Sequence, residues 1–150
     1  MEARSNGYMQ YVVPMDKLES FYDEPGEHGW IMEGFKHGFE RTSVVITSTE
    51  SRGGPPLHTH KTEEIHVLPE CFFAYIIGDH TFEVHGPCVV NIPALLPHTF
   101  LNLSDHAVRV VAFWPHNDFW MNYDELGVNP LFQLYGIPVA TAVEIEPQGD

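Results

Sequence analysis

The sequence predicts an all-β domain, a double-sheet jelly roll or a small barrel. Short segments rich in β-branched and aromatic residues follow one another from Trp30 to Trp114, and Gly, Pro and Asp residues separate them. Many short strands with such turn residues between them are typical of these architectures. With 150 residues, 43% of them hydrophobic, the chain is long enough for one core and too short for two typical domains.

The order of segments along the chain predicts three parts of this one domain. Residues 1–40 are predicted as an N-terminal extension that packs on the barrel, with a short helical turn at 15–22 after Pro14. The barrel core is predicted over residues 41–115. Its strands are expected at 41–49, 64–68, 72–77, 81–85, 89–92, 99–103 and 108–114. Residues 116–150 are predicted as an irregular C-terminal tail, with apolar residues that require burial.

The charge of the chain excludes two classes of partner. Seven basic residues against 21 acidic ones give a net charge of −14, without any cluster of Lys and Arg. Nucleic acid and anionic membranes are therefore not expected to bind. We assign this acidity to solubility rather than to a cationic substrate. The N-terminus lacks the apolar core of a secretion signal, so we expect a cytoplasmic protein in which Cys71 and Cys88 are reduced.

Three candidate metal ligands lie within seven positions of the sequence. His58 and His60 leave the same face of a β-strand, because side chains at i and i+2 point the same way. Glu64 follows after room for a bend. About thirty residues later, His98 comes directly after a turn bounded by Pro93 and Pro97. Histidines with a carboxylate suit a redox-active or Lewis-acidic divalent ion.

These residues give the chain a resemblance to the cupin superfamily. The first cupin motif reads approximately G-x5-H-x-H-x3or4-E-x6-G, and the second approximately G-x5-P-x-G-x2-H-x3-N. The matching positions here are His58, His60, Glu64, Pro93, His98 and Asn102. The resemblance spans roughly residues 41–115. It implies a double-stranded β-helix, a metal ion held by His58, His60, Glu64 and His98, and, from small cupins, a homodimer.

The chain departs from both motifs at their glycines. Cys71 and Leu95 stand where glycines are expected, and Gly53 and Gly86 are each displaced by one residue. Glycines govern turns, so we expect the turns to differ from the family pattern. No coordinating atom is lost, and the ligand set should therefore be kept.

The predicted ligand set leads to a functional hypothesis. Four protein ligands on an octahedrally inclined ion leave about two positions for other ligands, as a catalytic site requires. We expect one divalent ion, Fe(II) or Mn(II) first, with Zn, Ni, Co or Cu open. A dioxygenase-type oxidoreductase is the leading prediction. A non-redox lyase, isomerase, cyclase or decarboxylase, and a cupin that binds a ligand without catalysis, both stay open.

The neighbours of the predicted ligands suggest a proton-transfer residue and a substrate class. His66 shares its parity with Glu64 and should face the interior, either as a general acid or base or as a buried histidine with both nitrogens satisfied. The predicted interior is aromatic, which favours a small apolar or aromatic substrate over a sugar. The aromatic residues in question are Phe72, Phe73, Tyr75, Phe82, Phe100, Phe113 and Trp114.

Overall fold

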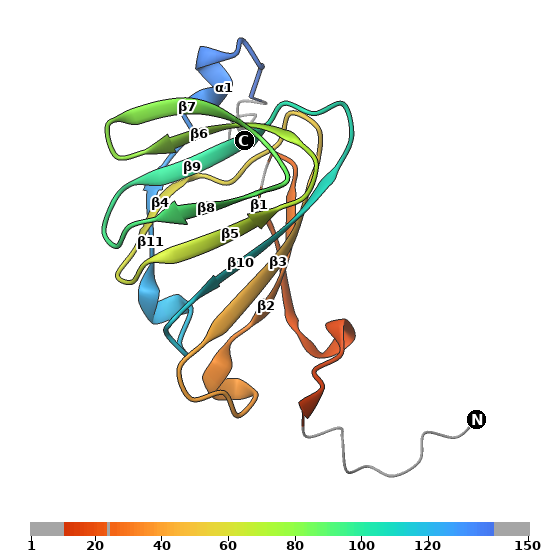
Figure 1. The fold of residues 1–150 in the computed structure, drawn as a ribbon, viewed down its shortest axis with the longest axis vertical. Helices are drawn as coiled ribbons and strands as arrows, with labels where there is room; N and C mark the ends of the chain where they lie inside the picture. Colours follow the sequence, from red (N-terminus) through yellow and green to blue (C-terminus); the bar gives the residue numbers. More distant parts are fainter. Residues whose placement is uncertain (1–10, 24, 140–150) are drawn as a thin grey trace, which may run out of the picture.

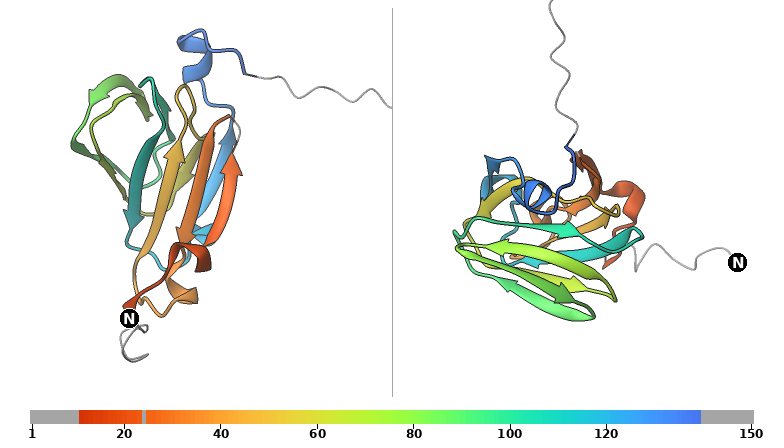
Figure 2. Two further views of the ribbon diagram at one scale, coloured as in Figure 1. Left: turned by 90° about the vertical axis from the view of Figure 1, so that its right-hand side faces the viewer. Right: turned by 90° about the horizontal axis from the view of Figure 1, so that it is seen from above.

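Two antiparallel sheets face each other and enclose the interior of the protein (Figures 1 and 2). The computed structural model describes residues 11–23 and 25–139 of the chain. Within them, one sheet has six strands in the order β1-β2-β3-β10-β5-β8, and the other has five in the order β11-β4-β9-β6-β7. The predicted all-β jelly roll is confirmed.

The six-stranded sheet contains β1 (Glu19–Asp23), β2 (Glu27–Met32), β3 (Ser43–Thr49), β10 (Val108–Trp114), β5 (Glu64–Leu68) and β8 (Cys88–Ile92). The five-stranded sheet contains β11 (Tyr123–Gly127), β4 (Leu57–His60), β9 (His98–Asn102), β6 (Phe72–Ile77) and β7 (His80–His85). The helical segments are short: η2 (Met15–Lys17), η3 (Gly34–Lys36), η4 (Trp120–Asn122) and α1 (Leu131–Leu134).

The alternation of side chains along the strands determines what enters the interior. On β10, Val108, Val110, Ala112 and Trp114 are buried, whereas Arg109 between them is exposed. The neighbouring strand β3 alternates in the same way. A period of two is the consequence of a pleated backbone, so the sequence of each strand fixes which of its residues face the opposite sheet.

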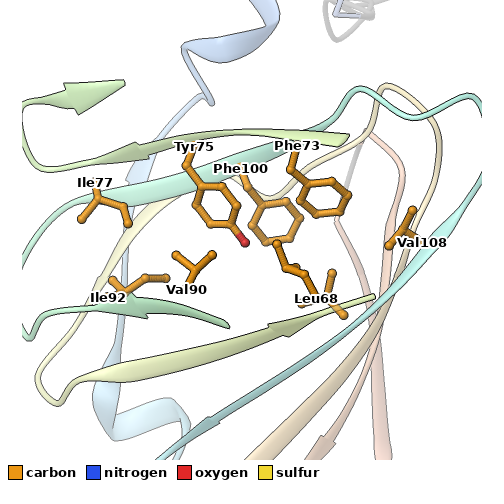
Figure 3. Close-up of a cluster of buried hydrophobic side chains, with 9 residues drawn as sticks. Leu68, Phe73, Tyr75, Ile77, Val90, Ile92, Phe100 and Val108 are labelled. Atoms are coloured by element: carbon orange, nitrogen blue, oxygen red, sulfur yellow. The ribbon is translucent and has the colours of Figure 1, made fainter. Parts of the chain in front are cut away.

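One half of the interior is filled by what we call the apolar core, which lies between β6–β9 and β5–β8 (Figure 3). Three aromatic rings pack together in its centre: Phe100 stacks on Phe73 with centroids 5.3 Å apart, and the tilted ring of Tyr75 lies 5.7 Å from that of Phe100. Its buried members are Leu68, Phe73, Tyr75, Ile77, Val90, Ile92, Phe100, Val108 and Val110. Close packing of large side chains leaves this half solid.

Strands also form outside the predicted barrel core of residues 41–115. The predicted N-terminal extension contains β1 and β2, which belong to the six-stranded sheet, and β1 begins at Glu19, so the helical turn ends earlier than expected. The predicted tail contributes β11, which pairs with β4. The sequence did not indicate these strands because β1 and β11 are short and acidic and lie at sheet edges, where exposed polar residues are tolerated, and because Gly29 interrupts β2.

Two apolar residues of the described C-terminal region, which ends at residue 139, pack on the outside of the barrel, and the predicted tail beyond that residue lies outside the described residues. Leu131 and Phe132 of α1 pack on Ala74 of β6 and Leu101 of β9, on the outer face of the five-stranded sheet. Cys71 and Cys88 are not bonded to each other, as predicted. Among the residues described, no helix has the length and apolar character that crossing a membrane requires. The homodimer stays a prediction.

Candidate metal centre

The four predicted ligands converge inside the barrel. His58 and His60 come from β4, Glu64 from β5 and His98 from β9, so both sheets contribute. Their ligand atoms all lie within 4.8 Å of one another, and all four side chains are buried. His58 and His98 are direct partners across β4 and β9, which places their imidazoles side by side.

The backbone fixes which nitrogen of each imidazole faces the centre. In each case Nδ1–H donates to a backbone carbonyl, and Nε2 therefore presents its lone pair to the cluster. The pairs are His58 with Pro56 (2.8 Å), His60 with Asn122 (3.1 Å) and His98 with Leu96 (2.9 Å). Three imidazoles oriented in this way are prepared to bind a metal ion.

The remaining atoms of the cluster also fit a metal ion. Glu64 Oε2 lies 2.7 Å from His60 Nε2 and 3.4 Å from His98 Nε2. Glu64 Oε2 and His98 Nε2 are buried and have no hydrogen-bond partner. Gathering lone pairs in a buried space is unfavourable unless a cation accepts them. This donor set therefore fits a divalent ion of the kind that binds nitrogen and oxygen ligands.

The protonation states agree with coordination. Burial, helped by the neighbouring His98, lowers the pKa of His58 to about 3, so this imidazole is neutral at pH 7. Burial alone would raise the pKa of Glu64, but His66, His60 and His98 together hold it well below its usual range. A neutral imidazole and an ionised carboxylate are the forms that bind metals.

A buried chain of hydrogen bonds leads from Glu64 to the apolar core. His66 Nε2–H donates to Glu64 Oε1, and the Tyr75 hydroxyl donates to His66 Nδ1 at 2.9 Å. Burial raises the pKa of Tyr75 well above its usual range, so its hydroxyl keeps the proton that it donates. His66 faces inward as expected, and both of its ring nitrogens have protein partners. Its role as an acid or base stays a prediction.

A cavity of about 180 Å³ lies beside the ligand cluster, and His58, His60 and Glu64 line it. For comparison, an engineered apolar cavity of about 150 Å³ accommodates benzene. Apolar and aromatic side chains form most of the wall: Phe21, Val45, Pro55, Phe100, Val110, Ala112, Trp114, Phe119, Trp120 and Tyr123. The polar wall residues are Asp23, Glu27, Thr47, His58, His60, Glu64, His66 and Glu125.

Sequence reasoning found only part of this wall. Of the seven aromatic residues predicted to face the interior site, Phe100 and Trp114 line the cavity. Phe73 and Tyr75 belong to the apolar core, and Phe82 is exposed. Several wall residues come instead from β1, β2 and the region after residue 115, and the aromatic run at 119–123 was the one signal that could have indicated them.

Tyr123, one of the unexpected residues, lies next to two of the ligands. It lies opposite His60 in the pairing of β11 with β4, and its ring centroid is 5.2 Å from that of His58. Burial, followed by the nearby Asp23, raises the pKa of its phenol. Tyr123 therefore presents a neutral hydroxyl group beside the metal centre.

The turn before His98 keeps a glycine-like backbone although its glycine is missing. Leu95 has φ = 67°, in the left-handed region that favours glycine. Its N–H donates to the carbonyl of His60 at 2.8 Å, which ties this turn to the ligand strand. The expectation that the turns would differ is therefore wrong at Leu95. The matched Asn102 is buried and holds the loops around it, donating to Thr49 and His106 carbonyls.

Comparison with known proteins gives the fold a name. The oxalate decarboxylase of Lactobacillus farciminis superposes with a TM-score of 0.67 at 19% identity, over 75% of this chain and 34% of that one. An S161A mutant of Bacillus subtilis oxalate decarboxylase gives 0.66 at 15%, over 75% and 31%. The polyketide cyclase RemF of Streptomyces resistomycificus gives 0.61 at 16%, over 79% and 86%. These proteins are cupins, and the chain has the cupin fold.

These similarities are structural. The chain spans about a third of the length of the oxalate decarboxylases, and nearly the whole of the polyketide cyclase. No protein-family profile matches the sequence. No curated protein matches it either.

Proposed function

We propose that the protein is a metal-dependent enzyme that acts on a small organic substrate in the cavity beside His58, His60, Glu64 and His98. The observation that carries this proposal is a cluster of four buried, convergent ligands, three of which (His58, His60 and Glu64) line a cavity of about 180 Å³. When bound, a divalent ion would supply Lewis acidity or redox chemistry there. Mn(II) or Fe(II) is preferred, and the Mn(II) centres of Bacillus subtilis oxalate decarboxylase support manganese.

The side chains of the wall have distinct roles in this proposal. Trp114 stacks on His60, with ring centroids 5.2 Å apart, and holds that ligand in place. Phe119 packs on Trp114 and, together with Tyr123, keeps water from the site. Tyr123 lines the same cavity, and its hydroxyl can donate a hydrogen bond to a bound substrate. The size of the cavity limits that substrate to about one ring or its equivalent in volume.

Two reaction classes follow from different observations. A dioxygenase-type oxidoreductase is favoured by the aromatic wall, which protects reactive species from water, and by a four-ligand set that leaves positions open. A non-redox lyase, isomerase, cyclase or decarboxylase is favoured by the similarity to a decarboxylase and a cyclase. In that class, the neutral Tyr123 hydroxyl beside the ligands supplies a hydrogen bond to the reacting group.

We propose that His66 holds the Glu64 carboxylate in position through their hydrogen bond. We also keep the prediction that His66 takes part in proton transfer. Its imidazole lines the cavity and also joins Glu64 to Tyr75. A His66→Ala variant should retain its metal with about 10- to 100-fold weaker affinity, the range typical of groups that orient a ligand. A His66→Gln variant, which can still donate to Glu64, should recover most of that affinity without recovering proton transfer. If His66→Ala is fully active and binds metal normally, both roles are excluded.

The proposed function is tested by metal analysis followed by turnover with and without oxygen. Protein purified without chelators should contain about one divalent ion per chain by elemental analysis. A screen of small organic compounds, monitored with an oxygen electrode and by mass spectrometry, should then identify turnover. Oxygen consumption in step with product indicates the dioxygenase, and equal turnover under argon indicates the non-redox class. A compound that binds tightly and returns unchanged would favour a binding protein instead.

A further inference from the structure

The cavity has a second polar end, formed by three carboxyl groups. Asp23 and Glu27 are direct partners across β1 and β2, so their side chains leave the same face of the six-stranded sheet. Glu125 reaches the cavity from β11 of the other sheet. Glu125 is exposed, Asp23 is half-buried and Glu27 is fully buried. We call these three residues the acidic end, and they lead from the surface into the cavity.

Glu27 is the unusual member of the acidic end. Its side chain is 5% exposed, it lines the cavity, and its Oε2 atom is buried without a hydrogen-bond partner. Burial raises its pKa well above the usual range, and the Asp23 and Glu64 carboxylates raise it further. Among the residues that line the cavity, none is Lys or Arg. A buried carboxyl group in this setting gains strongly from a ligand that brings a positive charge.

The acidic end does not have the form of a second metal site. In the part of the chain that the structure describes, only the cluster of His58, His60, Glu64 and His98 is close enough to hold a metal ion. The carboxyl groups of the acidic end instead come from strands of both sheets, Asp23 and Glu27 from β1 and β2 and Glu125 from β11, and all three line the cavity. Three aromatic side chains, Phe21, Trp120 and Tyr123, line the same cavity. Several carboxyl groups and aromatic rings around one cavity suit an organic cation, which is larger than a metal ion and interacts with ring faces.

We propose that the substrate of this cavity carries a protonated amine, and that Glu27, with Asp23 and Glu125, binds that group while the rest of the molecule extends toward the four ligands. This inference rests on the proposed function, because it names the substrate class of the same site. It also implies that small dicarboxylates are repelled by the acidic end. The acidity that we first assigned to solubility therefore has a local role here.

Three probes of similar size test the charge preference of the cavity. Benzylamine, which is a cation at pH 7, benzyl alcohol and benzoate are titrated into the metal-loaded protein by calorimetry. We expect benzylammonium to bind more than about tenfold more tightly than benzyl alcohol, because leaving one partner of a buried charge pair unmatched costs more than a tenfold change in affinity. Glu27→Gln should weaken benzylammonium more than about tenfold and leave benzyl alcohol unchanged.

Glu33 offers a matched control for this substitution. It is also a buried glutamate with an unpartnered Oε2, but it lies outside the cavity and is paired with Lys36 at 3.5 Å. Glu33→Gln should leave the affinities of all three probes unchanged.

A second variant, Glu125→Gln, changes an exposed member of the acidic end. It should weaken benzylammonium by a smaller factor, about two- to fivefold, because solvent screens the exposed charge.

The outcomes separate this inference from the proposed function. Normal metal content with no preference for benzylammonium would overturn the inference alone, and so would a failure of all three probes to bind. A loss of benzylammonium affinity in Glu33→Gln equal to that in Glu27→Gln would also overturn it. A protein that retains the ammonium preference but binds no metal would instead overturn the proposed function.

Discussion

The two halves of the interior are built from the same strands and have opposite characters. β5 supplies Leu68 to the apolar core and Glu64 and His66 to the metal centre. β9 likewise supplies Phe100 to the core and His98 to the centre. The core is packed solid, whereas the other half encloses a cavity with polar groups that lack partners. The strand pleat thus decides which residues point inward, and residue identity decides whether the space is filled.

This difference separates residues that stabilise the fold from residues that hold a ligand. In the apolar core, burial of large side chains favours folding directly. In the metal half, buried carboxyl and imidazole groups cost free energy until a cation binds. Substitutions in the two halves should therefore have separable effects on stability and on metal content.

The largest expected effect is the loss of metal from His98→Ala. This substitution removes one of four ligands from a buried cluster, and metal affinity should fall by more than about 100-fold, beyond the range for groups that only orient ligands. The measurement is metal content after dialysis against a weak chelator. His106→Ala is the control, because His106 lies in an exposed turn beside Asp105. Retention of full metal content by the His98 variant would contradict the centre.

The next effect is on stability alone, at Phe73. Phe73 is fully buried in the stack of rings with Phe100, and Phe73→Ala should lower the free energy of unfolding by about 3–5 kcal/mol. Denaturation in urea measures this change. Phe82→Ala, at a side chain that is 37% exposed, should cost roughly 1 kcal/mol. Metal bound per folded chain should stay the same in both variants. A specific loss of metal in either variant would contradict the separation between residues that stabilise the fold and residues that hold the ion.

The smallest effect is a pH-dependent gain in stability from Glu27→Gln. In the unfolded chain Glu27 has its usual pKa of about 4.5, and in the folded protein this pKa is raised. At a pH between the unfolded and the folded pKa, the folded chain therefore holds a proton that the unfolded chain has released. The stability that Glu27 contributes is therefore present below about pH 4.5 and lost as pH rises through the folded pKa. Glu27→Gln removes this loss.

This prediction is measured as the difference in Tm between the two chelator-treated proteins at a series of pH values. The variant should equal the unmodified protein near pH 4 and become more stable than it as pH rises. Comparing the proteins at each pH cancels the titration of the histidines. A difference that is constant with pH, or that favours the unmodified protein at alkaline pH, would show that Glu27 is not a buried acid without a partner.

The parts of the fold that sequence reasoning predicted are those with a strong local pattern. The strands predicted at residues 64–68, 72–77 and 108–114 have these bounds in the structure, because each is rich in β-branched and aromatic residues. β1, β2 and β11 were not predicted as strands. Their sequences are polar or irregular, and their pairing partners, not their own composition, make them strands.

The candidate site divides in the same way. The four ligands lie in two short motifs, so their spacing could be read directly from the sequence and the structure brings them together. The acidic end could not be predicted, because Glu27 and Glu125 are about a hundred positions apart and meet only through the facing of two sheets. Leu95 shows a further limit, since a leucine there adopts the backbone conformation expected of the missing glycine.

The strand pairing between β4 and β9 consists of one residue pair, His58 with His98, whereas β6 pairs with β9 over five positions. This is the shortest strand pairing in the five-stranded sheet, and its one residue pair consists of two of the ligands. An ion bound by both imidazoles would link β4 to β9 from inside the barrel. Metal loading would then tighten the barrel itself, and amide hydrogens of β4 should exchange faster once a chelator removes the ion.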